Sequence, residues 1–300
     1  MLELALRGAG GEPVDLYRTL NSHGFADLAP TYLDEAARTL EVTLRVPRGK
    51  PRRVRVGAGR PGRAAVTILG PAPGANPREH LLAGVRHVLR LDADLSGFYA
   101  MAADDPDLGW TTAGAGRMLQ SPTVFEDVIK TICTTNCAWS ATVRMVEALV
   151  QHLGDAAAAG DGPLTNAFPT PAAMGEASES FYREAVRAGY RGPYLIAVAR
   201  SVAEGQVDLE ALARDRELPD KEVERRLLAL PGVGPYAAAH IMMTIGRYSR
   251  LILDSWTRPK YARLTAKKKV SDAAIVRRFR RYGPYAGLAF WLFVTRDWVD

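Results

Sequence analysis

The segment LLALPGVGPYAAAHIMMTIG, residues 227–246, limits what this chain can fold into more than any other segment. Two apolar runs with helical spacing flank PGVGP, which predicts two short helices joined by a tight turn. Gly232 and Gly234 permit a positive φ and let another backbone approach closely. The N–H groups of the turn and of the second helix would point outward, where the helix dipole helps them to bind phosphate. An ordinary helical hairpin and a phosphate-binding hairpin both fit this segment.

The N-terminal part of the chain has a different pattern, which is typical of β-strands. Apolar and polar residues alternate in LEVTLRV (40–46) and in RRVRV (52–56), and the valines of RRVRV are expected to face a core and its arginines water. GPAPGANP (70–77) is dense in proline and glycine, as expected of a linker. A chain of 300 residues is long enough for about two domains. The sequence therefore predicts a β-rich domain over 1–77, followed by a helical region over 78–300.

Residues beyond this linker have apolar positions at helical spacing. SPTVFEDVIKTICTTN begins with Ser121 and has Pro122 at the first helical position, and WSATVRMVEALVQHLG continues as a second helix that stops at Gly154. The same spacing recurs in PYLIAVARSVAEG, LEALAR, DKEVERRLLAL, YAAAHIMMTIG and SDAAIVRRFRRYG. The sequence thus predicts a β-containing N-terminal domain on a larger all-helical region.

The net charge of +6 favours a polyanionic partner. Two basic clusters lie near the C-terminus, one at Lys267, Lys268 and Lys269 and one at Arg277, Arg278, Arg280 and Arg281. A solvated helical face is the alternative interpretation of each cluster.

The cysteines and the apolar runs indicate the compartment. Cys133 and Cys137 are the only two cysteines, and their spacing of four places both on one helical face. They are too few for a four-thiolate cluster, so we expect core thiols in a reduced cytoplasmic setting. No apolar run reaches the roughly 18 residues of a membrane span. The N-terminus has no signal-peptide pattern, so we expect no membrane association.

A single carboxylate follows the hairpin. LILDSWTRPKYARL places Asp254 directly after three apolar residues. A carboxylate at this position is either a helix N-cap or a charge that is retained for chemistry.

The order LPGVG, helix, apolar run and aspartate resembles the helix-hairpin-helix (HhH-GPD) DNA glycosylases, the superfamily of endonuclease III, MutY, 8-oxoguanine glycosylase and AlkA. Three other segments are similar to the AlkA and 8-oxoguanine glycosylase branch: residues 121–154, RAGYRGPYLIAVARSV (187–202), and RRYGPYAGLAFWLFVTRDW near the C-terminus. The match follows the correct order along the chain, and the N-terminal third is matched by pattern only.

The resemblance implies an α+β fold. It consists of a mostly α-helical, two-lobed helix-hairpin-helix glycosylase core and an N-terminal antiparallel β-sheet domain. The central helical lobe is expected over 121–253, with the hairpin at 221–246. The second lobe is expected to combine 78–120 with 254–300.

The resemblance also implies a mechanism. Breaking an N-glycosidic bond builds positive charge on the sugar, as in glycoside hydrolysis, and a nearby carboxylate stabilises that charge and can activate water. By resemblance this carboxylate is Asp254. Bifunctional members have a lysine at the position of Tyr236, whose amine forms a Schiff base with the sugar. Tyrosine cannot form one, so a monofunctional enzyme is expected. Lys260 is the only nearby amine that could restore lyase activity, and a surface lysine is the favoured interpretation.

The remaining site residues follow from the same resemblance. Tyr236 and Trp291 are expected in the base pocket, although Tyr236 could pack at a helix start and Trp291 in a core. Asn136 would fill the gap that a flipped base leaves, although it could be a helix-capping residue. The predicted DNA-binding residues are Asn136, Gly232, Val233, Gly234 and Arg258.

Several aromatic and polar residues have less specific assignments. Trp139 and Trp256 are weaker pocket candidates, and Tyr190 and Tyr194 are expected to pack against the hairpin helices. His240 is expected to be a packed or exposed polar residue rather than a base.

The implied partner is double-stranded DNA that contains a damaged base, bound by a monomer in the cytoplasm, or at the nucleoid if the source is bacterial. No metal and no iron–sulfur cluster are expected, because the C-terminal region has no cysteine, and this argues against the endonuclease III and MutY branches. A monovalent cation held by backbone carbonyls of the hairpin is possible in this family.

Alkylated purines are the expected substrates, because cationic bases are good leaving groups and favour aromatic walls. The alternatives are another lesion (an oxidised purine, or a deaminated or mismatched base), a non-catalytic DNA-binding hairpin protein, and a soluble protein that binds small molecules.

Overall fold

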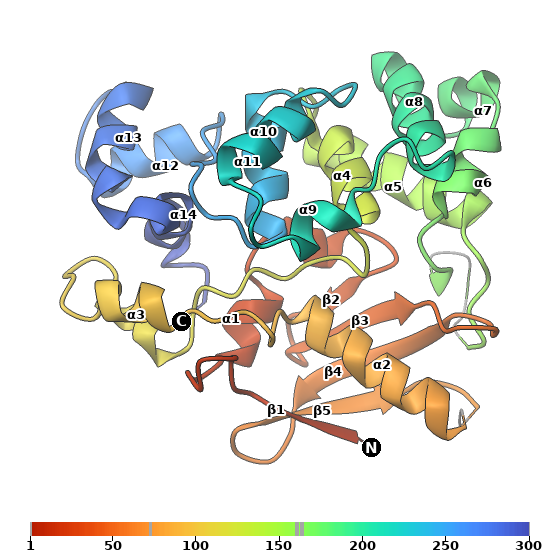
Figure 1. Ribbon diagram of the computed structural model, residues 1–300, viewed down its shortest axis with the longest axis horizontal. Coiled ribbons are helices and arrows are strands. Elements are labelled where there is room, and N and C mark those ends of the chain that lie inside the picture. Colours follow the sequence, from red (N-terminus) through yellow and green to blue (C-terminus); the bar gives the residue numbers. More distant parts are fainter. Residues whose placement is uncertain (1, 72–73, 160–161, 163–164, 300) are drawn as a thin grey trace.

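The computed structural model describes residues 2–71, 74–159, 162 and 165–299. An antiparallel sheet with one long helix lies on one side of the molecule, and most of the other helices lie on the opposite side (Figure 1). The sequence-based prediction of an α+β fold, with a β-sheet domain followed by a helical region, is confirmed.

The sheet has five strands in the order β1-β5-β4-β3-β2, and every described pairing is antiparallel. Its strands are β1 (Leu2–Ala5), β2 (Tyr32–Asp34), β3 (Thr39–Leu44), β4 (Arg52–Ala58) and β5 (Arg63–Ile68). In the register Val54 lies opposite Val42, and Val56 lies opposite Leu40 and Val66, which places these side chains in one core.

Arg53 departs from the prediction for RRVRV. Val54 and Val56 are buried as expected, but Arg53 is also buried instead of facing water. Its Nε donates to Glu41 Oε2 at 2.6 Å and its Nη1 donates to the Pro30 carbonyl at 2.9 Å. Strand alternation predicts the face to which a side chain points. Alternation does not predict whether another segment covers that face, and here the Pro30 segment does.

Helix α2 (Ala75–Val88) lies across the sheet (Figure 1). Its Leu81, Val85 and Val88 belong to the same core cluster as the strand residues. The sequence-based limit at residue 77 assigns this helix to the helical region, whereas its apolar face packs on the sheet. Of the predicted linker 70–77, residues 75–77 form the start of α2, and residues 72 and 73 lie outside the described residues. The division into domains stays a prediction.

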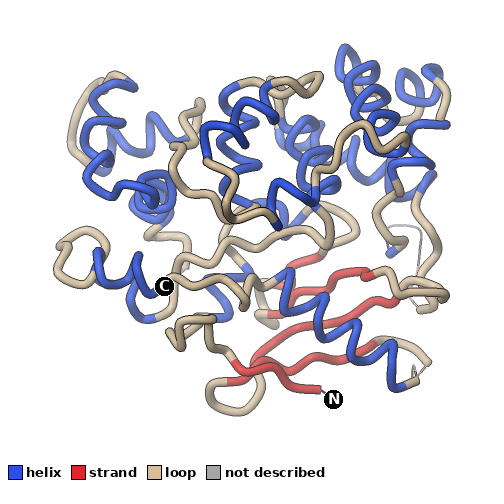
Figure 2. Tube along the Cα trace, in the orientation of Figure 1, coloured by secondary structure: helices blue, strands red, loops and turns tan. Residues whose placement is uncertain are grey.

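The other helices form two groups with separate cores (Figure 2). The first group contains α4 (Val124–Thr134), α5 (Trp139–Leu153), α6 (Pro171–Glu176), α7 (Glu179–Glu184), α8 (Gly192–Ala203), α9 (Glu210–Arg214), α10 (Asp220–Leu228) and α11 (Pro235–Thr244). The second contains α3 (Ser96–Ala102), α12 (Thr257–Leu264), α13 (Asp272–Phe279) and α14 (Ala286–Thr295). Short α1 (Leu16–Leu20) and the 3₁₀ turn η1 (Gly24–Asp27) precede β2. Phe25 and Leu28 from this N-terminal stretch pack in the first helical core.

Three charged side chains of α4 are buried beside this N-terminal stretch. Lys130 Nζ lies 2.7 Å from Glu126 Oε1 and donates to the Leu28 carbonyl at 3.2 Å. Asp127 accepts a hydrogen bond from the Ser121 N–H at 3.1 Å. Burial raises the pKa of Asp127 from 3.8 to about 7, although hydrogen bonds from Ser121 lower it in part.

The raised pKa of the Asp127 carboxyl predicts that the stability of the protein depends on pH. Between the two pKa values the folded protein binds more protons than the unfolded chain, so the free energy of unfolding falls as the pH rises through that window. At about 1.4 kcal/mol per pKa unit the effect is on the order of 4 kcal/mol. Asp127→Asn keeps an acceptor for Ser121 and is expected to abolish this contribution, as measured by urea unfolding at pH 5 and pH 8. Asp104→Asn, on an exposed turn, is the control. An identical pH dependence in Asp127→Asn and wild type would contradict the prediction.

Candidate active site

The predicted hairpin is formed by α10 and α11. Gly232 adopts φ +80°, and a Cβ at this position would lie 2.9 Å from the Tyr194 ring. The turn is closed by a bond from the Val233 N–H to the Leu230 carbonyl at 3.1 Å, and Pro235 is the first residue of α11. The N–H groups of Gly232 and Gly234 have no acceptor among the described residues. The turn therefore presents free backbone donors at a helix N-terminus, the arrangement that binds phosphate.

A large cleft opens beside this hairpin, between the two helical groups, with a volume of about 1210 Å³. Seven of the predicted site residues line it: Asn136, Gly232, Gly234, Tyr236, Asp254, Arg258 and Trp291. Val233 does not, because its side chain is buried under the turn in the first helical core. The fold thus brings together residues from four separate parts of the chain.

Asp254 is not the N-cap of α12, which is Trp256, but its carboxylate bonds to the residues at the start of that helix. Its Oδ1 accepts the N–H groups of Trp256 at 2.8 Å and Thr257 at 2.6 Å, which organises the start of α12. Its own N–H donates to Thr257 Oγ1 at 2.9 Å. Oδ2 has no hydrogen-bond partner among the described residues, and the half-buried side chain lines the cleft. One oxygen therefore fixes the carboxylate while the other stays available to a ligand.

Tyr236, in the first turn of α11, contacts both helical cores. Its hydroxyl lies 3.4 Å from Thr134 Oγ1. Burial raises the pKa of Tyr236, and the charge of Asp254 raises it further. Tyr236 is therefore a neutral phenol close to the carboxylate.

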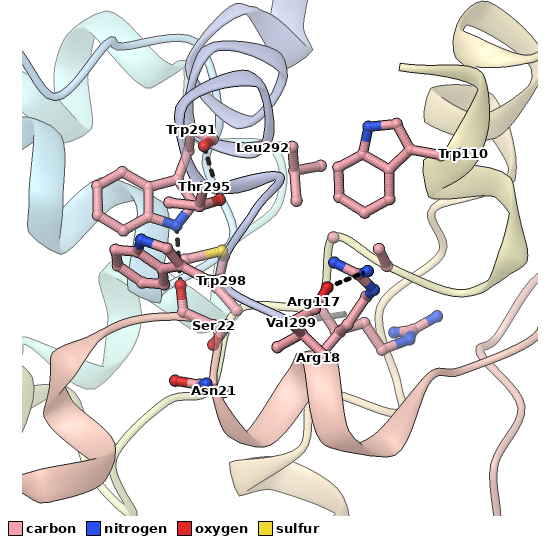
Figure 3. Close-up of a pocket in the computed structure, with 13 residues that line it drawn as sticks. Arg18, Asn21, Ser22, Trp110, Arg117, Trp291, Leu292, Thr295, Trp298 and Val299 are labelled. Carbon is pink, nitrogen blue, oxygen red and sulfur yellow. Dashed lines mark hydrogen bonds between the residues drawn. The ribbon is translucent and has the colours of Figure 1, made fainter. Parts of the chain in front are cut away.

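Trp291, on α14, has its indole Nε1 donating to the Ser22 carbonyl at 2.8 Å (Figure 3). It forms an aromatic group with Trp256 and Trp298, with ring centroids 6.0 and 5.6 Å from that of Trp291. Trp291 is almost fully buried, whereas Trp256 is 40% exposed. Trp256 is thus the more accessible of the two in the cleft wall.

Asn136 and Arg258 lie at the rim. Asn136 is exposed between α4 and α5 with φ +48°, and its Nδ2 donates to the Tyr190 hydroxyl at 3.4 Å. Arg258 forms a two-bond ion pair with Asp272, at 2.7 and 2.9 Å. Arg258 could contact DNA only by sharing or leaving that carboxylate.

No lysine side chain lines the cleft among the described residues. Lys260, the amine nearest to Asp254 in the sequence, bonds both carboxylate oxygens of Asp297. Lys260 is buried, so its interpretation as a surface lysine was wrong. Its place on α12 sets it against the end of α14, which a linear pattern does not show.

The cleft floor contains residues that the sequence reasoning did not assign to the site. His23 and Phe25 enter from the stretch before β2 and pack with His240 of α11. The ring centroids of Phe25 and His240 are 4.8 Å apart, and those of His23 and His240 are 5.8 Å apart. His240 is therefore packed, which is one of the two environments that were expected for it. The only signal for His23 and Phe25 was their position in NSHGF, a stretch matched by pattern alone.

Within the described residues no helix is long and apolar enough to cross a membrane. No group of three or more histidine, cysteine, aspartate or glutamate side chains among them could hold a metal ion.

Comparison with known proteins gives consistent neighbours. No family model matches the chain. It is 23% identical over 173 residues to a DNA-3-methyladenine glycosylase of Bacillus subtilis, covering 57% of this chain and 56% of the relative. It is 29% identical over 135 residues to an N-glycosylase/DNA lyase of Saccharomyces cerevisiae, covering 42% of this chain and 35% of the relative. The matched regions thus span about half or less of these relatives.

Two solved structures share the whole architecture. A 3-methyladenine DNA glycosylase from Archaeoglobus fulgidus superposes with a TM-score of 0.74 at 19% identity, covering 99% of both chains. An 8-oxoguanine glycosylase/lyase of Clostridium acetobutylicum, in complex with double-stranded DNA containing cytosine opposite 8-oxoguanine, gives 0.72 at 21% identity, covering 95% of this chain and 92% of the other. At these identities the structures show that the fold is shared. The homologues and structural neighbours of this chain are therefore DNA glycosylases.

Proposed function

We propose that this protein is a monofunctional DNA glycosylase that hydrolyses the bond between a damaged base and its deoxyribose in duplex DNA. The observation that carries the proposal is Asp254, whose Oδ1 is fixed by two N–H groups while Oδ2 is left to the cleft beside the hairpin. A protein that only bound DNA would gain nothing from an acceptor carboxylate so close to bound phosphates.

In the proposed reaction the hairpin binds the DNA backbone and the cleft receives the target base. The free amides at Gly232 and Gly234 would hold a backbone phosphate. The target base must leave the stack, which costs a few kcal/mol. Asn136, exposed at the rim, would enter the vacated space, and Phe25, Tyr236 and Trp256, which also line the cleft, would offer aromatic surfaces to the flipped base.

The bond to the base then breaks by hydrolysis. The base departs with the electron pair of the C1′–N bond, and positive charge develops on the sugar. Asp254 Oδ2 stabilises that charge, and a water oxygen bonds to C1′ while its proton passes to Asp254 or to solvent. The product is an intact abasic site. With no lysine side chain lining the described cleft, no Schiff base and no strand cleavage are expected.

An alkylated purine is the proposed substrate, since a positively charged base fits beside Asp254 and aromatic faces and leaves as a neutral molecule. Similarity to an 8-oxoguanine glycosylase/lyase makes an oxidised purine the second candidate. A monovalent cation at the hairpin carbonyls, a monomeric state and a cytoplasmic or nucleoid location belong to the same proposal.

A panel of duplexes that each carry one defined lesion tests the proposal. The protein is incubated with 7-methylguanine, 1,N6-ethenoadenine, hypoxanthine, 8-oxoguanine, uracil or a mismatch, and alkali then reveals abasic sites. We expect alkali-dependent breaks, fastest at 7-methylguanine. Absence of breaks at every lesion, together with DNA binding that does not weaken with salt, would refute the glycosylase proposal.

A further inference from the structure

The floor of the cleft has few free hydrogen-bond donors. Four side chains that line it each donate to a backbone carbonyl of α4: Thr134 to Thr131 at 2.7 Å, Thr135 to Ile132 at 2.8 Å, and Cys137 and Thr142 to Cys133 at 3.2 and 3.0 Å. His23 Nε2 donates to the Leu119 carbonyl at 2.5 Å, and its Nδ1 accepts the Phe25 N–H at 3.3 Å.

The hydroxyl proton of Tyr236 is also donated within the protein. Because Thr134 Oγ1 already donates to a carbonyl, the Tyr236 hydroxyl is the donor in their 3.4 Å contact. Tyr236 therefore offers only oxygen lone pairs to a ligand.

The tautomer of His240 follows from Thr131. Thr131 Oγ1 donates to the Asp127 carbonyl at 2.7 Å, so at 3.4 Å from His240 Nδ1 it can only accept. Nδ1 therefore carries the proton, and Nε2 carries a lone pair. Nδ1 is turned to α4, Nε2 has no partner among the described residues, and His240 lines the cleft.

His240 stays neutral over the working pH range. Burial lowers its pKa to about 3, with a smaller contribution from His23. Burial likewise lowers the pKa of His23 to about 4. The two imidazoles at the cleft floor are thus both neutral, and they pack with the Phe25 ring.

We infer that His240 is a specificity-determining residue whose Nε2 accepts a hydrogen bond from the flipped base. The inference rests on the proposed function and narrows its substrate class. A base that presents an N–H group satisfies His240, whereas a base that presents only acceptors leaves two lone pairs facing each other in a dry site. Unpaired polar groups of this kind are what let a site reject an analogue.

The substrate class is therefore a purine lesion with an N–H donor. Hypoxanthine and 7-methylguanine carry such a group, and 1,N6-ethenoadenine carries none. Comparison of variant with wild type on each lesion removes the intrinsic lability of its glycosidic bond from the result.

His240→Phe retains a ring against Phe25 and Tyr236 and removes the acceptor. We expect single-turnover excision of hypoxanthine and 7-methylguanine to slow about 10- to 100-fold, with much less change for ethenoadenine. An equal loss on all three lesions would indicate a structural role, and an unchanged ratio would also overturn the inference.

Thr131→Val provides a test that leaves His240 in place. It removes the acceptor that fixes the tautomer, so it is expected to shift the lesion ratio in the same direction as His240→Phe. Thr19→Val is the matched control, because Thr19 is equally buried and donates to the Asp15 carbonyl at 2.7 Å, away from the cleft. An unchanged ratio in Thr131→Val would contradict the assigned tautomer.

Nitrogen-15 NMR of histidine-labelled Asp254→Asn protein separates this inference from the proposed function. On a duplex that the variant does not cut, the His240 Nε2 resonance is expected to move for hypoxanthine and not for ethenoadenine. Excision by wild type without this response refutes the inference alone. A normal response without any excision by wild type refutes the proposed function alone.

Discussion

Asp254→Asn is expected to slow base excision by about 10²- to 10³-fold, the usual effect of removing one preorganised electrostatic group, while duplex binding is retained. Asparagine keeps an oxygen for the N–H groups of Trp256 and Thr257, so the start of α12 is preserved. What is lost is the charge on the oxygen that faces the cleft. Single-turnover excision and DNA affinity, measured on the same lesion duplex, check the two parts separately.

The matched control is Asp15→Asn. Asp15 is the N-cap of α1, where its side chain accepts the Arg18 N–H at 2.9 Å, and it lies outside the cleft. It is expected to keep full activity. An excision rate in Asp254→Asn equal to that of the control would remove Asp254 from the mechanism.

Tyr236→Lys is expected to give the protein a covalent intermediate that the wild type lacks. By resemblance, Tyr236 corresponds to the position at which bifunctional glycosylases have their lysine, and the charge of Asp254 acts on it. Partial burial there would lower the pKa of the introduced amine and raise the fraction of neutral nucleophile. Attack on C1′ would form a Schiff base, and borohydride would reduce it to a stable protein–DNA complex that is visible on a denaturing gel.

Tyr194→Lys is the control for position, because Tyr194 lies at the rim and is 38% exposed. It is expected to give no trapped complex. Trapping by both variants would show that any amine in the cleft reacts. Failure of Tyr236→Lys alone, in a folded protein that still binds DNA, would place Tyr236 away from the sugar.

Local patterns in the sequence predict the parts of this fold that depend on near neighbours. Residues 40–44 and 52–56 form strands where alternation places them, although the predicted strand 40–46 ends at Leu44, and PGVGP forms the turn between α10 and α11. Asp254 stood out by its position directly after an apolar run and by the family resemblance, and its short-range bonds to the Trp256 and Thr257 N–H groups hold its side chain at the start of α12.

Features that depend on distant contacts were not predictable from one sequence. His23 and Phe25 reach the cleft floor because the Ser22 carbonyl accepts the Trp291 indole N–H, a contact across 269 positions. Arg53 is buried because Pro30 and Glu41 cover one face of the sheet. The hydroxyl groups of Thr131 and Thr134 donate to backbone carbonyls of α4, and these bonds also determine what the cleft can bind. Composition and spacing carry no trace of them.

Hydrolysis without an amine nucleophile is tested most directly by borohydride trapping of the wild-type protein. A 7-methylguanine duplex is incubated with the enzyme and divided between alkali and borohydride. The proposed mechanism predicts strand breaks only after alkali and no covalent protein–DNA complex. Strand breaks without alkali, together with a borohydride-trapped complex, would contradict it.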